Sequence, residues 1–289
     1  MKADCACKPP RSCSLCAEST PEWNSSSVKT VIFERTSASC SFPDACEQAI
    51  LCIDCGKRFK LVERPLFPAL RCEGHTEMQE VQNWPPLSGL HLIRDFIDDN
   101  MVAKYFDSRA ESLWKDSHGG RRKLDFGPQA NFKKKKVKIG DFRGFDPETR
   151  CLIDAVKCAP CFSTPFRVVE ISTLDYNPEK GANLDPHVDD EWIWGERVAG
   201  ISMMNDSVIS FLSMLSPDSP VFEVFVPLPR NSLFVIEGHA RHKWLHGFRT
   251  QGLPFQRVSV TMRELNQQFC IENPDAADAI HLVADTVFS

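Results

Sequence analysis

A series of short β-like runs fills most of the chain from residue 166 onward. Runs such as RVAGISMM, SVISFL, VFEVFVPL and SLFVIE follow one another closely, with turn residues between them. Many short strands at this spacing are typical of a β-sandwich or a β-barrel. Before them we expect a strand in GLHLIRDF and two helices, one over residues 99–108 capped by Asp98 and one that starts after Asp146. The sequence therefore predicts an α+β, mainly β fold with N-terminal helices.

The composition is that of an ordinary globular protein, with 42% hydrophobic and 25% charged residues in a chain of 289. Its net charge of -5 excludes a uniformly basic nucleic-acid-binding protein but leaves room for a local basic patch. We find no apolar run long enough to cross a membrane, and the N-terminus lacks the apolar core of a secretory signal. We therefore expect a protein of the cytoplasm and nucleus with no membrane partner.

Cysteines are concentrated near the N-terminus, with nine of the thirteen in the first 72 residues. In a reducing compartment such a cluster favours metal ligation over disulfides. Four thiols spaced C-x-C-x5-C-x2-C match the tetrahedral ligand set of structural zinc, and they predict a zinc site within a Cys-rich leader. Its ligands would be Cys5, Cys7, Cys13 and Cys16. A looser C-x2-C…C-x2-H set resembles no zinc finger, and its role stays open: Cys52, Cys55, Cys72 and His75.

Two groups of residues indicate a second metal site. His187 and Asp189 lie two apart, so on a strand both side chains point to one face, although H-x-D alone is a weak signal. The segment GHARHKWLHGF adds His239, His242 and His246. Two histidines and one carboxylate leave coordination positions open, as in non-haem Fe(II) oxygenases. A zinc protease is excluded, because HKWLH has lysine where HExxH needs its general base.

The run RVSVTMR, residues 257–263, alternates strictly. On a strand, Arg257 and Arg263 share a polar face with Ser259 and Thr261. The opposite face is apolar and consists of Val258, Val260 and Met262. The planar fork of arginine binds carboxylates bidentately, which suits the far carboxylate of a 2-oxo acid co-substrate. The pattern predicts a barrel wall that lines a polar site, although an amphipathic surface strand explains the alternation equally well.

Taken together, the segments HVD (187–189), WLH (244–246) and RVSVTMR resemble the AlkB-homologue family of Fe(II)/2-oxoglutarate dioxygenases. The flanking sequence is similar to the fourth-homologue subfamily in the segments GRRKLDFGP, LDYNPEKGANLDPHVDDEWIWGERV and VSVTMREL. The N-terminal segment CACKPPRSCSLC is also similar to that subfamily. The likeness extends over roughly residues 85 to 270. It implies a double-stranded β-helix (jelly-roll) core.

The resemblance also implies an iron centre. It assigns the iron ligands to His187, Asp189 and His246, because the family's distal histidine stands in a W-x-H segment. His242 is then expected behind the ligands or in the core.

For the co-substrate, the resemblance implies that Arg257 pairs with the distal carboxylate of 2-oxoglutarate and that Tyr176 hydrogen-bonds it. Arg263 is expected near the chelating end, where it also pairs with Glu191. Two positions depart from the founding member, which has asparagine at both: Leu174 and Ser259.

The implied reaction is oxidative N-demethylation with Fe(II), 2-oxoglutarate and O2, and with ascorbate as reductant. 2-Oxoglutarate becomes succinate and CO2, and the hydroxylated N-methyl group leaves as formaldehyde. The expected organisation is a Cys-rich zinc leader (1–30), an N-terminal extension (31–85), the dioxygenase domain (86–270) with a basic recognition lid near 120–140, and a polar C-terminal tail (271–289). A monomer is expected.

A basic segment over residues 121–138 is the candidate substrate-binding region, and phenylalanines are interleaved with its lysines. Lysines neutralise phosphates and bases stack on aromatic rings, so the segment suits nucleic acid, although a solvated loop or a nuclear-targeting signal has the same composition. Candidate substrate residues are Arg121, Arg122, Lys123, Phe126, Phe132, Lys133, Lys134, Trp192 and Trp194.

The resemblance leaves two substrate classes, N6-methyladenine in DNA and monomethyl-lysine on a protein such as actin. An acidic protein would also be drawn to the basic segment, so the charge run does not choose between them. The competing hypothesis is a non-catalytic, zinc-containing adaptor that binds actin or chromatin.

Overall fold

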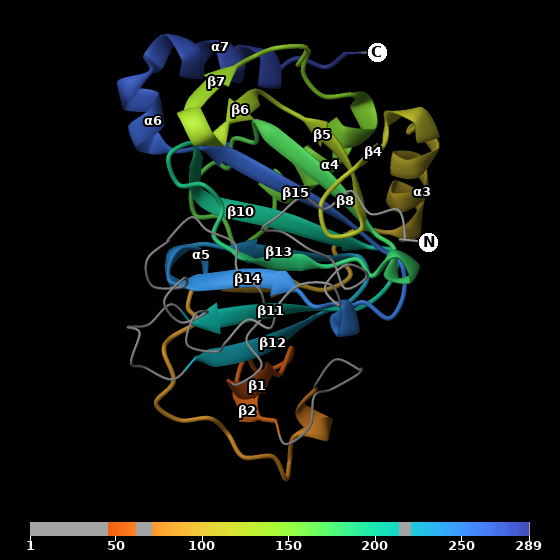
Figure 1. Ribbon diagram of the computed structural model, residues 1–289, viewed down its shortest axis with the longest axis vertical. Coiled ribbons are helices and arrows are strands. Elements are labelled where there is room, and N and C mark those ends of the chain that lie inside the picture. The colour runs from red at the N-terminus through yellow and green to blue at the C-terminus, as the bar shows by residue number, and fades with distance from the viewer. Residues whose placement is uncertain (1–45, 62–70, 214–220, 289) are drawn as a thin grey trace, which may run out of the picture.

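Two β-sheets pack against each other in the computed structural model, which describes residues 46–61, 71–213 and 221–288 (Figure 1). The seven-stranded sheet has the order β3–β13–β10–β15–β8–β5–β4. Its strands are β3 (Leu90–Ile93), β4 (Lys115–Asp116), β5 (Arg121–Phe126), β8 (Glu170–Tyr176), β10 (Trp194–Met203), β13 (Ser232–Ile236) and β15 (Arg257–Leu265). The six-stranded sheet has the order β2–β1–β12–β11–β14–β9. Its strands are β1 (Glu47–Leu51), β2 (Arg58–Lys60), β9 (Leu184–His187), β11 (Ser207–Ser213), β12 (Phe222–Leu228) and β14 (Trp244–Phe248).

From β8 to β15 the chain crosses repeatedly between the sheets. β8, β10, β13 and β15 lie in the seven-stranded sheet, whereas β9, β11, β12 and β14 lie in the six-stranded sheet. All pairings among these eight strands are antiparallel. This crossing pattern is a double-stranded β-helix, or jelly roll, so the predicted fold class is confirmed. The strand expected in GLHLIRDF forms β3, which pairs with β13 at the sheet edge.

Two hydrophobic cores lie on opposite faces of the seven-stranded sheet. One lies between the sheets and includes Val198 and Phe234 from one sheet and Phe211 and Val224 from the other. The second covers the outer face. It joins Val258, Val260 and Met262 of β15 to apolar residues of the helices. The apolar face predicted for residues 257–263 is therefore buried, and the opposite face of β15 is turned toward the interior of the jelly roll.

The two predicted helices are confirmed. α3 (Asp99–Asp107) is capped by Asp98, whose Oδ1 accepts a hydrogen bond from the backbone N of Met101 at 2.7 Å. α4 (Pro147–Lys157) has Pro147 in its first turn, and Asp146 caps it by accepting from the backbone N of Thr149 at 3.0 Å. Figure 1 shows α4 close to the seven-stranded sheet.

The C-terminal segment differs from the polar tail that the sequence suggested. It forms α6 (Gln267–Glu272) and α7 (Pro274–Ala284). Ala277, Ile280 and Ala284 of α7 are buried and belong to the outer core. The three residues recur at helical spacing, so one stripe of α7 is buried against the outer core.

The remaining elements are short. β6 (Gln129–Asn131) and β7 (Lys136–Lys138) form a separate hairpin around the 3-10 turn η3 (Phe132–Lys134). A five-residue helix, α5 (Gly238–His242), precedes β14. Further 3-10 turns are η1 (Cys72–Gly74), η2 (Glu111–Leu113), η4 (Pro178–Lys180) and η5 (Thr250–Gly252).

The N-terminal extension joins the jelly roll through its edge strand. β1 pairs in parallel with β12 and antiparallel with β2, which forms the sheet edge. The predicted leader, with Cys5, Cys7, Cys13 and Cys16, lies outside the described residues, and the domain boundaries stay a prediction. Among the described residues, no helix is long and apolar enough to cross a membrane.

Candidate metal and co-substrate site

The three predicted iron ligands come together at two neighbouring strands of the six-stranded sheet, with His187 on β9, His246 on β14 and Asp189 just after the end of β9. β9 and β14 pair antiparallel, with His187 directly opposite His246. Asp189 follows His187 by two residues, so the alternation of an extended chain returns its side chain to the same face. One ligand atom from each of the three side chains lies within 4.8 Å of the others.

Burial keeps both imidazoles in the form that binds metals. It lowers the pKa of His246 to about 3, with a further contribution from neighbouring His187, and it also lowers the pKa of His187. The Nδ1–H of His187 donates to the backbone carbonyl of Asp185 at 2.9 Å, which fixes the tautomer and leaves Nε2 with its lone pair. Both imidazole rings are therefore uncharged at physiological pH, and each can offer a nitrogen lone pair to a metal ion.

Arg263 holds the carboxylate of Asp189. Its Nε and Nη2 lie 2.9 and 2.7 Å from Oδ1, whereas Oδ2 has no hydrogen-bond partner among the described residues and faces His246 Nε2 at 3.6 Å. Burial alone would raise the pKa of Asp189, but Arg263, His246 and the buried Arg241 outweigh it and hold this pKa well below its usual range. An ionised carboxylate with one free oxygen thus faces the two histidines.

The prediction that Arg263 pairs with Glu191 is wrong. Arg263 pairs with Glu170 through Nη1 at 2.7 Å as well as with Asp189, and not with Glu191. The register explains this, because Arg263 stands directly opposite Glu170 across β15 and β8. Glu191 instead meets His242 at 2.5 Å.

The position of His242 also differs from the expectation. This residue is partly exposed and binds Glu191 and Glu196, so it lies neither behind the ligands nor in the core. His239 contacts Ser88 through Nδ1 at 2.9 Å, also away from the metal site.

Arg257 is buried in the interior of the jelly roll. The residue is 0% exposed, yet both Nη atoms lack hydrogen-bond partners among the described residues. Its Nε contacts Ser202 at 3.2 Å, and its guanidinium stacks over the ring of Phe248, 4.2 Å from the centroid. Burial lowers its pKa to about 10, so it stays charged at neutral pH. Tyr176 stands directly opposite Arg257 on β8, and the centroid of its ring lies 5.3 Å from Cζ of the guanidinium.

These unsatisfied groups fit the metal and co-substrate that the motifs imply. An unpaired buried charge is costly unless a ligand completes it. The two free Nη donors of Arg257 match the two oxygens of a carboxylate. Two neutral imidazoles and one carboxylate match the 2-His-1-carboxylate set that binds Fe(II). Leu174, beside this region, packs in the inter-sheet core, and Ser259 is buried.

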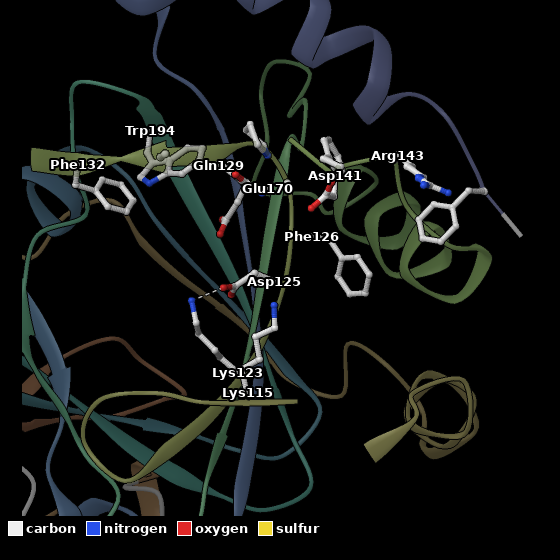
Figure 2. Close-up of a pocket in the computed structure, with 16 residues that line it drawn as sticks. Lys115, Lys123, Asp125, Phe126, Gln129, Phe132, Asp141, Arg143, Glu170 and Trp194 are labelled. Atoms are coloured by element: carbon white, nitrogen blue, oxygen red, sulfur yellow. Dashed lines mark hydrogen bonds and ion pairs between the residues drawn. The ribbon is translucent and has the colours of Figure 1, made fainter. Parts of the chain in front are cut away.

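A cavity of about 240 Å³ opens at the metal ligands. His187, Asp189 and Arg263 form part of its wall. A larger cavity of about 590 Å³ shares five wall residues with it, namely Lys123, Asp125, Phe132, Glu170 and Trp194. Figure 2 shows the carboxylates of Asp125 and Glu170 and the rings of Phe132 and Trp194 around this larger space. The shared wall places a substrate-sized space next to the metal ligands.

The basic segment is not a single solvated loop, which its composition left open as an alternative. Residues 121–126 form β5 within the seven-stranded sheet. Arg121 is buried and donates to the carbonyl of His118 at 2.7 Å. Arg122 pairs with buried Asp175 at 2.7 Å. These two arginines are therefore bound by the protein itself, because a strand inside a sheet must satisfy its own buried charges.

The other candidate substrate residues lie in three cavities and on one exposed turn. Lys123, Phe132 and Trp194 line the cavity at the metal ligands, and Phe126 lines only the larger cavity. Lys133 and Lys134 are exposed on η3. Trp192 instead lines a separate cavity of about 520 Å³, with Lys135 and Lys136 of the hairpin and residues of α6.

Two residues at the site were missed from the sequence. Glu170 pairs with Arg263 and lines the same cavity, and burial raises its pKa to about 7. Arg241 is 0% exposed and donates to the backbone carbonyl of Asp189 at 3.0 Å. No local pattern marks either residue. The register of Arg263 with Glu170 is the signal that identifies Glu170, and it becomes available only once the strand pairing is known.

No family model matches the chain. It is 31% identical over 296 aligned positions to the human alpha-ketoglutarate-dependent dioxygenase alkB homolog 4, covering 92% of this chain and 87% of the human protein. The mouse protein of the same name is 32% identical over 220 positions, covering 67% and 73%. A DNA N6-methyl adenine demethylase of Caenorhabditis elegans is 32% identical over 184 positions, covering 63% and 62%.

Among solved structures, OsALKBH1 matches with a TM-score of 0.40 and 14% identity, covering 63% of this chain and all of that one. The non-heme alpha ketoglutarate dependent epimerase SnoN matches with a TM-score of 0.42 and 15% identity, covering 62% and 78%. The family assignment depends on the sequence relatives, of which the human protein is matched over most of both chains. This chain belongs to the AlkB homologues, a family of alpha-ketoglutarate-dependent dioxygenases.

Proposed function

We propose that the chain demethylates N6-methyladenine in DNA, with Fe(II) held by His187, Asp189 and His246 and with 2-oxoglutarate held by Arg257. The observation that carries the proposal is the pair of unsatisfied buried groups: a carboxylate oxygen of Asp189 between two neutral histidines, and both Nη atoms of Arg257. Family membership supports the reaction class, and the nucleic-acid substrate is the proposal's own step.

Each protein group has a defined task in this reaction. When bound, iron with 2-oxoglutarate and O2 supplies the oxidising chemistry that inserts oxygen into the N-methyl C–H bond. Arg263 orients the Asp189 carboxylate by gripping Oδ1, so that Oδ2 is directed at the metal position. Arg257 neutralises the far carboxylate of the co-substrate in a buried, low-dielectric position. The surrounding core excludes bulk water from the reacting groups.

The hairpin β6–β7 supports a nucleic-acid substrate. Lys133, Lys134, Lys135, Lys136 and Lys138 carry its positive charge. Phe132 is 48% exposed and lines the cavity at the metal ligands. Lysines on the hairpin suit backbone phosphates, and an exposed ring at the cavity mouth suits a base turned out of its stack. The name of the C. elegans relative, a DNA N6-methyl adenine demethylase, agrees with this choice.

A second candidate substrate is monomethyl-lysine on an acidic protein such as actin. The observation in its favour is the pair of carboxylates, Asp125 and Glu170, in the wall of the same cavity. Carboxylates stabilise a methylammonium group, whereas a neutral adenine gains only hydrogen bonds from them. The basic hairpin would then attract the acidic partner. Either substrate is compatible with a protein of the cytoplasm and nucleus.

Succinate and formaldehyde release tests the proposal. The purified chain, with Fe(II), 2-oxoglutarate and ascorbate, is given an N6-methyladenine oligonucleotide or a monomethyl-lysine actin peptide. We expect the oligonucleotide to raise both products in equal amounts in the wild type and in His242→Ala, but not in Asp189→Ala. Stimulation by the peptide alone would replace DNA with methyl-lysine. No turnover in any arm, with iron bound, would favour the non-catalytic adaptor.

A further inference from the structure

Four potential metal ligands meet at the far edge of the six-stranded sheet. Cys52 and Cys55 lie in the turn between β1 and β2, and Cys72 and His75 lie at and just after η1. One ligand atom from each of the four lies within 4.8 Å of the others. β1 and β2 lie at the lower end of the molecule in Figure 1. In the strand order of the sheet, β12, β11 and β14 separate β1 from β9 of the iron site.

We propose that Cys52, Cys55, Cys72 and His75 form a structural zinc site. Three thiolates and one imidazole are a ligand set that tetrahedral zinc takes in structural sites, with all four positions filled by protein. The set contains no carboxylate and has no open position, so its chemistry differs from that of the iron centre. Each cysteine loses its thiol proton when it binds the ion.

The distances between the ligand atoms fit a zinc tetrahedron. With Zn–S about 2.3 Å and Zn–N about 2.0–2.1 Å, tetrahedral angles place two sulfurs about 3.8 Å apart and a sulfur and a nitrogen about 3.6 Å apart. The Sγ atoms of Cys52 and Cys72 are 3.9 Å apart, and Cys55 Sγ lies 3.6 Å from His75 Nε2. None of the three cysteines forms a disulfide among the described residues, so each thiol can bind a metal ion.

The surrounding backbone is shaped to present these ligands. Gly56, just after the second cysteine, has a positive φ of 70°, which an L side chain rarely adopts. The turn is closed by hydrogen bonds from Cys52 N to Lys57 O at 2.8 Å and from Gly56 N to Cys52 O at 2.9 Å. Both bonds fold the C-x2-C segment back on itself, which turns two thiols toward one point.

Neighbouring side chains hold the other two ligands. Asp54 accepts a hydrogen bond from the backbone N of Cys72 at 3.2 Å and pairs with Arg71 at 3.2 Å. Phe59 of β2 stacks on the ring of His75, with centroids 4.0 Å apart. Partners that orient metal ligands in this way are a usual part of metal sites. The site therefore rests on contacts beyond the four ligands.

A zinc ion here would join two segments that the sheet alone does not connect. The ion links the β1–β2 turn to residues 72–75, and β1 is the strand that covers the edge of β12. An uncovered strand edge is a site of unwanted pairing between molecules. Among the described residues of the extension, buried Ile50 packs with Val208 and Phe225 of the jelly roll rather than in a core of its own. A metal crosslink would therefore supply stability that packing within the extension does not.

Zinc content of the full-length chain tests the proposal. Cys52→Ser/Cys55→Ser is compared with the wild type and with Cys151→Ser/Cys158→Ser, which removes two exposed cysteines, one within α4 and one at its C-cap. The leader cysteines and the iron triad are intact in all three chains, so the difference reports this site alone. We expect the first variant to lose about one zinc per chain and the control to lose none. Equal zinc content in all three would overturn the proposal.

Alkylation of the wild type provides a test that needs no variant. Cys55 and Cys72 are exposed, as are Cys151 and Cys158. Thiolates bound to zinc react slowly even when exposed, so peptide mapping after iodoacetamide treatment should show Cys55 and Cys72 protected relative to the other two. A chelator should abolish that protection. Equal alkylation of all four in the zinc-loaded chain, without chelator, would contradict a zinc site.

Discussion

At the residue scale, the site is defined by buried charged groups that keep polar atoms without a hydrogen-bond partner in the described part of the chain. Arg257 and Asp189 are each nearly inaccessible, and each keeps polar atoms without a hydrogen-bond partner among the described residues. By contrast, buried Arg197 and Glu264 satisfy each other through bonds of 2.6 and 2.9 Å. A protein gains nothing from unsatisfied buried charge unless a ligand supplies the missing partner. Among the described residues, Arg257 is the one buried arginine with both Nη atoms unpaired, which is the arrangement that a carboxylate ligand would complete.

Arg263→Lys is predicted to weaken metal binding. Lysine keeps the positive charge but cannot bond Asp189 and Glu170 at the same time with the fork of arginine. The Asp189 carboxylate is then free to rotate away from the histidines. We expect Fe(II) affinity to fall about 10- to 100-fold, as is usual when a partner of a metal ligand is lost. Anaerobic Fe(II) titration measures the change.

Arg197→Lys is the matched control for that experiment, because Arg197 is also buried and paired but lies outside the metal site. An Arg263→Lys chain that bound Fe(II) as tightly as this control would show that Arg263 does not position Asp189.

At the element scale, the parts that the sequence predicted were those governed by local rules. The N-caps of α3 and α4 follow from Asp98 and Asp146 alone, and the alternation of β15 correctly separated its buried apolar face from its arginine face. Strand β5 was missed as an element of the sheet, because its arginines look solvated until Asp175 is placed beside them by strand pairing. The structure of β5 therefore depends on residues of β8 that are distant in the sequence.

Asp146→Ala is predicted to destabilise the protein by about 1–2 kcal/mol, the usual effect of losing an N-cap. The loss is at the upper end because Asp146 also binds Arg109, whose side chain is only 3% exposed. Asp98→Ala, which removes the exposed cap of α3, should have a smaller effect. Urea denaturation measures both, and the reverse order would contradict the coupling of the α4 cap to Arg109.

Lys133→Glu/Lys134→Glu is predicted to weaken DNA binding at all sequences alike. If both lysines contact phosphates, the slope of log Kd against log salt falls by about 2. Lys104→Glu/Lys157→Glu, on α3 and α4, makes the same charge change away from the hairpin and should leave the slope unchanged. Fluorescence anisotropy over a salt series gives both slopes. Identical slopes for the two variants would remove the hairpin from the DNA-binding surface.

At the scale of the whole molecule, the jelly roll brings together residues that the sequence keeps far apart. His187 and His246 are separated by most of the β core, yet β9 and β14 set them side by side. The motifs predicted which residues meet, through their resemblance to a family. They did not predict Glu170 or Arg241, which reach the site through cross-strand register and a short helix, or the arrangement of Cys52, Cys55, Cys72 and His75. The first two depend on tertiary pairing that no local pattern encodes.

The central claim is that one buried site holds both the metal and 2-oxoglutarate. Anaerobic calorimetric titration of 2-oxoglutarate into the Fe(II)-loaded chain tests it most directly. We expect one molecule bound per chain, with affinity about 10- to 100-fold weaker in Arg257→Lys, because a charged hydrogen-bond pair contributes about 1.5–3 kcal/mol. Binding should be lost without Fe(II) and in Asp189→Ala. Equal affinity in the wild type, Arg257→Lys and Asp189→Ala would contradict the account.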